Sequence, residues 1–284
     1  MSEFRIDQIK SQDASRGPDI AGITTFTGTS GIVMPSGDTY YGRYLTEDPF
    51  YDSMILGIPF NEPTKQAFFD YSKYAITMDP IGSISIDTGE SKFYGSSATL
   101  DGNGDGVRTP LSGSSYSLGL GSFTAEAWIR CTDFSHANYL LVANTVDEVS
   151  NDGYGFAFGL SGTTGIFTVN VQRNNGADLT RIFGTTSPAV ECTETFETNT
   201  WTHICMTYDA TYGPQGEYRA YKNGKLIGKK DDSPRRNFGE TRFYVGKTHN
   251  TTHNFEGQLQ DVKLYRGAVK YPRDGFDVPG QMAR

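Results

Sequence analysis

One carboxylate stands inside an otherwise strand-like stretch near the end of the chain, at Asp261 within residues 255–269. The second half of the stretch alternates with the period of a half-buried strand. One predicted face carries Gln260, Val262 and Leu264, and the other carries Asp261, Lys263 and Tyr265. A carboxylate in such a strand requires solvent, a hydrogen-bonding partner or a metal ion, because burying an unpaired charge is costly. Asp261 is therefore the first candidate for chemistry.

Glu126, in the alternating run 122–130, is the second candidate acid, and with a second acid on the same strand face it could hydrolyse a sugar bond. A retaining glycosidase places two carboxyl groups about 5 Å apart across that bond. The predicted neighbours of Glu126 on its strand face are Thr124, Trp128 and Arg130, so no second acid follows it. A further group of acids is spaced three apart and scatters around its strand: Glu191, Glu194 and Glu197. We predict no catalytic residue.

A turn rich in Asp and Gly, residues 101–106, matches the first half of an EF-hand calcium loop. Its twelfth position is Ser112, where the EF-hand places a Glu that binds calcium through both oxygens. The cysteines Cys131, Cys192 and Cys205 show no metal-ligand spacing, and we expect them to be small buried residues of a protein made in a reducing cytoplasm. The sequence therefore predicts neither an EF-hand nor a cysteine metal site.

Three polar loops between predicted strands are candidates for ligand binding, because sandwich folds display function on their loops. They cover residues 151–154, 173–176 and 209–213, and each combines amides or acids with a Tyr or an Arg. Such groups hydrogen-bond to sugar hydroxyls and stack on sugar rings. The candidate ligand-binding residues are Tyr154, Arg173, Asn175 and Tyr212. The alternative is that these loops are ordinary surface turns.

The elements that must position these residues are short strands. The 284 residues include 33 Gly, 13% aromatic and only 20% charged residues, which favours an all-β protein with many tight turns. Asn223-Gly224 predicts a type I′ hairpin between strands 218–222 and 225–228. Further strands are predicted at 53–60, 75–78, 82–86, 97–101, 122–130, 138–143, 154–160, 166–171, 179–183, 200–208 and 241–246. This spacing indicates a two-sheet sandwich.

Residues 1–50 differ from the rest because their hydrophobic residues are sparse. We predict an attachment arm that becomes ordered on another subunit, followed by one domain at 51–284. Alternatively, residues 1–50 add edge strands to their own domain.

The net charge of −8 argues against nucleic-acid binding, and without a signal peptide or a long apolar run we expect no membrane insertion.

Six segments in order carry a family resemblance. They are residues 97–105, 123–129, 201–204, 221–226, 244–246 and 255–265. Together they look like the laminin-G-like, concanavalin A-like jelly roll, over residues 51–279. The resemblance implies that Asp261 binds a structural Ca²⁺ together with the carbonyl of Gly102. The alternative is that Asp261 caps backbone N–H groups.

The leader resembles those of virion structural proteins in tailed phages, especially phages of marine cyanobacteria. The residues concerned are Phe4-Arg5-Ile6-Asp7 and Gly22-Ile23-Thr24-Thr25-Phe26. This implies a non-enzymatic tail, fibre or appendage component of the virion, made in the host cytoplasm and present as a homo-oligomer or in many copies on the particle. The arm would contact other virion proteins, and the jelly roll would bind host surface polysaccharide. Alternatives are a capsid decoration or assembly protein without glycan binding, and a divergent glycoside hydrolase.

Overall fold

The computed structural model describes the chain from Asp48 to Val278 with gaps, and two short strands before it. The described residues are 32–33, 39–40, 48–61, 68–110, 117–135, 138–145, 154–162, 165–172, 179–184, 190, 192, 194–231, 241–247 and 254–278. Leu45–Ala283 form one compact unit, and the chain before it forms a second. In that second unit, β1 (Ile32–Val33) pairs with β2 (Thr39–Tyr40) in antiparallel register.

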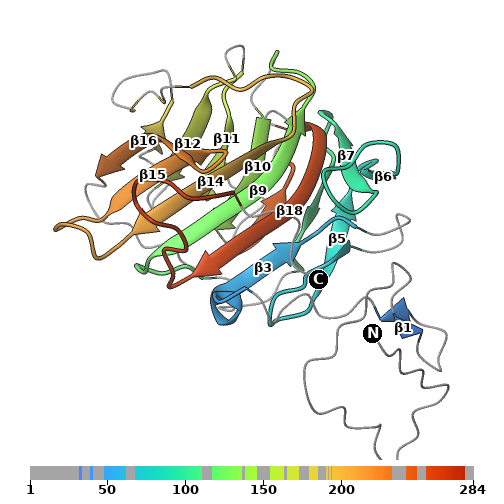
Figure 1. Ribbon diagram of the computed structural model, residues 1–284, viewed down its shortest axis with the longest axis horizontal. Helices are drawn as coiled ribbons and strands as arrows, with labels where there is room; N and C mark the ends of the chain where they lie inside the picture. The colour runs from blue at the N-terminus through green and yellow to red at the C-terminus, as the bar shows by residue number, and fades with distance from the viewer. Residues whose placement is uncertain are drawn as a thin grey trace, which may run out of the picture. The chain divides into compact units, whose positions relative to one another are not determined.

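The first large sheet is built around the long strand β18, and we call it the β18 sheet (Figure 1). Its strands in spatial order are β16 (Lys225–Asp231), β15 (Glu217–Lys222), β14 (Thr202–Asp209), β9 (Phe123–Cys131), β18 (Glu256–Arg266), β7 (Ser97–Asp101) and β6 (Ser85–Asp87). On the side away from β9, β18 pairs first with β7 and then with β3 (Met54–Ile58), which follows the 3₁₀ turn η1 (Tyr51–Ser53). The strand predicted at residues 53–60 thus pairs with the strand predicted near the end of the chain.

The second sheet is the β10 sheet, which is also antiparallel. Its strands in order are β13 (Leu179–Phe183), β12 (Phe167–Gln172), β11 (Tyr154–Leu160), β10 (Asn138–Thr145), β17 (Thr241–Val245), β8 (Gly106–Arg108), β5 (Thr77–Ile81) and β4 (Phe68–Phe69). The strands β4 and β8 were not predicted, because two or three residues are too few to show a period of two.

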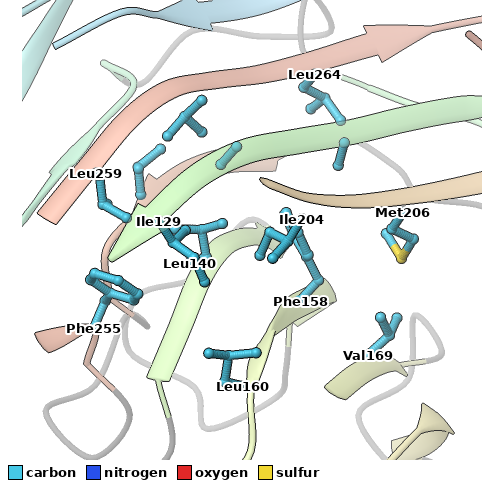
Figure 2. Close-up of a cluster of buried hydrophobic side chains, with 14 of the residues drawn as sticks. Ile129, Leu140, Phe158, Leu160, Val169, Ile204, Met206, Phe255, Leu259 and Leu264 are labelled. Atoms are coloured by element: carbon cyan, nitrogen blue, oxygen red, sulfur yellow. The ribbon is translucent and has the colours of Figure 1, made fainter. Parts of the chain in front are cut away.

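The hydrophobic core lies between the two sheets (Figure 2). Inward side chains of the β18 sheet, such as Ile129, Ile204 and Leu259, meet Leu140, Phe158 and Val169 of the β10 sheet. The alternation predicted for the run 122–130 is confirmed, since Phe123, Ala125, Ala127 and Ile129 all belong to the hydrophobic core. Together these observations confirm the all-β, two-sheet antiparallel sandwich.

A β-bulge in β18 breaks the alternation that the sequence predicted. Gln260 pairs with Trp128 and Lys263 with Glu126, so β18 holds one more residue than β9 over this interval. The extra residue is Asp261, whose φ of 50° is left-handed. Gln260 therefore faces away from the core and accepts hydrogen bonds from the backbone N–H groups of Lys92 and Phe93. Its predicted place beside Val262 and Leu264 was wrong, because the bulge shifts the pattern by one residue.

The turn between β15 and β16 has the predicted type I′ character. Asn223 has a φ of 48° and Gly224 a φ of 76°, the two positive values that this turn requires. Cys131, Cys192 and Cys205 are all buried, as expected. Within the described part of the chain, no helix has the length and apolar character needed to span a membrane.

Candidate functional site

After β18 the chain turns back across the outer face of the β18 sheet, the face that points away from the core (Figure 1). We call residues 267–278 the C-terminal strap. Its backbone contacts β9 where Lys270 N–H donates to Thr124 Oγ1 at 3.0 Å. It reaches the β15–β16 turn where Phe276 N–H donates to the Gly224 carbonyl at 2.9 Å. The strap thus buries polar side chains that would otherwise face solvent.

Glu126 of β9 lies beneath the strap and is only 1% exposed. Its Oε1 contacts Lys270 Nζ at 2.9 Å and accepts from the Tyr265 hydroxyl at 3.2 Å. Its Oε2 lies 3.3 Å from His203 Nε2 and accepts from the Tyr271 hydroxyl at 2.5 Å. Burial opposes ionisation, but Lys270, the His203 hydrogen bond and Lys263 outweigh it and hold the Glu126 pKa well below its ordinary value. Both oxygens of this carboxylate are therefore engaged by the protein.

Asp48 meets the strap at the same place. Its Oδ2 accepts from the Tyr265 hydroxyl at 2.6 Å and lies 3.1 Å from Lys270 Nζ. Burial acts to lower the pKa of Lys270, but Glu126 and Asp48 more than offset it, so the pKa is raised. Burial and the Glu126 charge raise the pKa of Tyr271 far enough to keep its phenol protonated as a donor. Asp48, at the start of the domain, and the C-terminal strap therefore both contact the network of side chains around the buried Glu126.

Asp261, the first candidate from the sequence, is 2% exposed on this outer face. The Tyr94 hydroxyl lies 3.0 Å from both of its oxygens, and Lys263 Nζ lies 3.9 Å from Oδ2. Burial raises the Asp261 pKa, although Lys263 and Tyr94 partly offset the effect. In the described structure its carboxylate contacts side chains, so it does not cap backbone N–H groups as the alternative proposed.

The structure does not bring Asp261 and Gly102 together. Asp101 pairs with Glu256, and Asp261 lies five positions further along β18, roughly 16 Å away at strand rise. The Gly102 carbonyl instead accepts a hydrogen bond from the Asn254 side chain at 3.2 Å. These two residues therefore do not fit a shared calcium ion. Nor do three His, Cys, Asp or Glu side chains gather as a metal site anywhere in the described residues.

Tyr212 lies on the loop between β14 and β15 and is 47% exposed. The guanidinium carbon of Arg273, from the strap, lies 3.4 Å from the centre of its ring. Arg273 is itself held by Glu217 at 2.6 Å and by Asp209 at 3.4 Å. Asp209 Oδ1 also accepts from the backbone N–H and the hydroxyl of Thr211, at 3.0 and 2.7 Å, which shapes the loop. We call Tyr212, Arg273 and Asp209 the Tyr212 platform.

Of the other predicted ligand-binding residues, the structure describes only Tyr154. Tyr154 begins β11 and pairs with Asn144, so it belongs to the β10 sheet. Arg173 and Asn175 lie outside the described residues. Sequence reasoning missed Arg273 entirely. No periodicity or spacing could have found it, because its stacking on Tyr212 depends on the path of the strap across the sheet.

Comparison with known families places this geometry in context. Residues 101–271 match the family model described as the concanavalin A-like lectin/glucanases superfamily. No curated protein matches the chain.

Several solved structures share the fold. The binding domain of Paraclostridial Mosquitocidal Protein 1 has 17% identity and a TM-score of 0.55, over 78% of this chain and 51% of that one. The binding domain of Botulinum Neurotoxin DC in complex with SialylT has 16% identity and a TM-score of 0.53, over 78% and 50%. Domain 4 of AbnA, a GH43 extracellular arabinanase from Geobacillus stearothermophilus, in complex with arabinotriose, has 16% identity and a TM-score of 0.51, over 76% and 93%. The chain spans about half the length of the two toxin domains. At these identities the likeness concerns the fold alone.

Proposed function

The chain belongs to the concanavalin A-like lectin/glucanases superfamily, and from this premise we propose that it is a non-enzymatic, glycan-binding structural protein of a phage virion. The observation that carries the binding role is the Tyr212 platform. An aromatic ring exposed to water contributes little to the stability of a monomer. Sugar rings present an apolar face that stacks on such a ring. Because Arg273 covers one face of Tyr212, the ligand would stack on the other.

The protein offers hydrogen-bonding groups beside that ring. Among the described residues, Asp209 Oδ2 contacts only Arg273, at 3.4 Å, so it retains capacity to accept from a sugar hydroxyl. Two structures with the same fold support this reading, since one is a complex with arabinotriose and the other a complex with SialylT. Their identity to this chain is low, and they contribute only that proteins with this fold occur in complexes with such ligands.

The buried acids favour a non-catalytic protein. A retaining glycosidase needs a carboxylate free to attack the sugar and a second one free to protonate the leaving group. Both oxygens of Glu126 are engaged beneath the strap. For the hydrolase alternative to hold, the protein would have to release sugar from a polysaccharide, and Glu126→Gln would have to abolish that release.

The virion role rests on the resemblance of the leader sequence to those of tailed-phage structural proteins. In this proposal residues 1–50 dock on other virion proteins, and the jelly roll projects toward the host surface polysaccharide. Many copies on one particle would convert a weak single-site affinity into strong attachment, because linked sites rebind at high effective concentration. Tail, fibre and appendage positions all suit this role.

A glycan array probed with the purified chain tests the binding role. We expect specific hits that Tyr212→Ala abolishes and Tyr212→Phe retains, because the ring and not the hydroxyl does the stacking. Phe69→Ala is the matched control, since Phe69 is 46% exposed on β4 of the other sheet and should leave binding unchanged. A blank array for the parent protein would remove the glycan role and favour a capsid decoration protein.

A further inference from the structure

The two arginines at the Tyr212 platform, Arg273 and Arg219, are both held by ion pairs within the protein. Arg273 contacts Glu217, Asp209 and the Tyr212 ring. Arg219 pairs with Glu217 and donates to the Arg273 carbonyl. Neither guanidinium can turn toward a ligand without breaking an ion pair. An acidic sugar would therefore find no free fork of donors, which is the usual means of recognising a carboxylate.

The neighbouring strand does not change this balance. In the register of β15 and β16, Lys229 lies opposite Arg219 and Asp231 lies opposite Glu217, so β16 adds one charge of each sign. Among the described residues, the cations are Arg219, Lys229 and Arg273, and the acids are Asp209, Glu217 and Asp231. Asp274, exposed and next to Arg273, adds a fourth acid. The patch is thus neutral to slightly negative, in a chain whose net charge is −8.

Two acceptor oxygens at the loop keep hydrogen-bonding capacity. Asp209 Oδ2 is one of them. Gln215, three residues beyond Tyr212, has a buried side-chain oxygen without a hydrogen-bond partner among the described residues. A buried acceptor without a donor is costly, and hydroxyl groups are what would satisfy it. A carboxylate or sulfate on the ligand would bring only further acceptors.

We propose that the Tyr212 platform selects uncharged sugars, with an apolar ring face against Tyr212 and hydroxyl groups donating to Asp209 and to the loop. This inference rests on the proposed function and deepens it by naming the class of ligand. Sialylated, uronic acid and sulfated glycans are disfavoured, because like charges facing each other across an interface are repulsive.

The experiment compares matched neutral and acidic forms of the same glycans, such as desialylated and sialylated oligosaccharides, by titration with the full chain. We expect the neutral form to bind at least roughly ten-fold more tightly. Its affinity should hold between about 50 and about 500 mM NaCl, because no net charge is exchanged. Asp209→Asn leaves Arg273 with one acidic partner fewer. In this variant the ratio of the affinity for the neutral glycan to that for the acidic glycan should fall.

The outcomes separate this inference from the function it rests on. Tighter binding of the acidic form, with an affinity that falls as salt rises, would overturn the selection of neutral sugars and leave glycan binding intact. Equal binding of both forms, unaffected by Asp209→Asn, would also overturn it. Failure of every glycan to bind would instead remove the proposed function.

Discussion

Glu126 shows how a buried acid can serve structure in a fold that also hosts hydrolases. Its partners come from three elements: Tyr265 and Lys263 from β18, His203 from β14, and Lys270 and Tyr271 from the strap. A buried ion pair of this kind contributes modestly when complete, because desolvation offsets most of the attraction. Removing one partner is far more damaging, since the remaining charges stay buried and unpaired.

Replacing Glu126 by Gln should lower the free energy of unfolding by about 3–5 kcal/mol, since Lys270 and Lys263 lose their common counter-charge. Chemical denaturation at neutral pH measures this. Lys270→Met is the companion variant, and the double variant should cost clearly less than the sum of the two single changes. Additive losses would show that the two groups do not interact.

The ion pairs of Glu126 should also affect how the stability depends on pH. The folded pKa of Glu126 lies below its unfolded value of 4.5, so its contribution is fully present above that pH. The contribution is lost as the pH falls from there through the folded pKa. Glu126→Gln should therefore flatten the acid limb of stability against pH, and an unchanged limb would contradict the assignment.

Asp261 has the opposite tendency, because burial raises its pKa and disfavours the charged form. Its effect reduces stability as pH rises from the unfolded value of 3.8 through the higher folded pKa. Asp261→Asn removes the buried charge, can still accept from Tyr94, and suits the left-handed φ. We expect a gain on the order of 1 kcal/mol at pH 7, within the usual range of stabilising changes.

Thermal melts of parent and Asp261→Asn, with and without EDTA, measure this. The same melts test the predicted calcium, which needs the charged oxygens of Asp261. A destabilised variant, together with a parent sensitive to chelation, would favour a metal at this bulge.

At the scale of elements, the strap depends on the close approach of two backbone segments. A Cβ on Gly224, whose φ is +76°, would collide with the carbonyl oxygen of Phe276. That carbonyl belongs to the residue whose N–H bonds to Gly224. The type I′ turn therefore does more than join β15 to β16, because it also provides the docking point for the end of the strap.

Gly224→Ala should detach the strap end, raise hydrogen exchange over residues 270–276, and weaken glycan binding as Arg273 leaves Tyr212. Gly95→Ala is the matched control, since Gly95 has a φ of +77° and no atom within 4 Å of the added Cβ. The control should lose only the left-handed strain of about 1–2 kcal/mol. Equal exchange over the strap in both variants would show that the contact with Phe276 does not hold it.

The predicted boundary between the attachment arm and the sandwich, at residue 50, falls among residues that contact the sandwich. Asp48, on the arm side of the predicted boundary at residue 50, bonds to Tyr265 and Lys270. Phe50 and Tyr51 pack against Met54, Tyr265 and Ala268. The sandwich therefore uses residues that the sequence assigned to the arm.

Deleting residues 1–44 should leave the melting temperature unchanged, whereas deleting residues 1–50 should lower it by several degrees, since Asp48 and Phe50 are lost. Both deletions should prevent incorporation into phage particles, measured by the protein content of purified virions. Normal incorporation without residues 1–44 would contradict the attachment role, and loss of folding in that variant would contradict an independent sandwich.

The sequence was sufficient for properties that depend on neighbouring residues. Alternation revealed the inward face of β9, and Asn223-Gly224 revealed a type I′ turn, because side-chain direction and φ are local properties. It also identified Tyr212 as a candidate, from the composition of its loop. These features required no knowledge of distant contacts.

Only the tertiary structure decided which residues meet. The bulge at Asp261 follows from the register of β18 against β9, so the face of Gln260 could not be read from alternation alone. The strap brings Lys270 to Glu126 and Arg273 to Tyr212, pairs distant in sequence and linked by no period. The register of β18 against β7 separates Asp261 from Gly102. The sequence alone thus determines the residue types and the local backbone conformation. The charge balance of a site depends instead on which distant segments lie side by side in the folded chain.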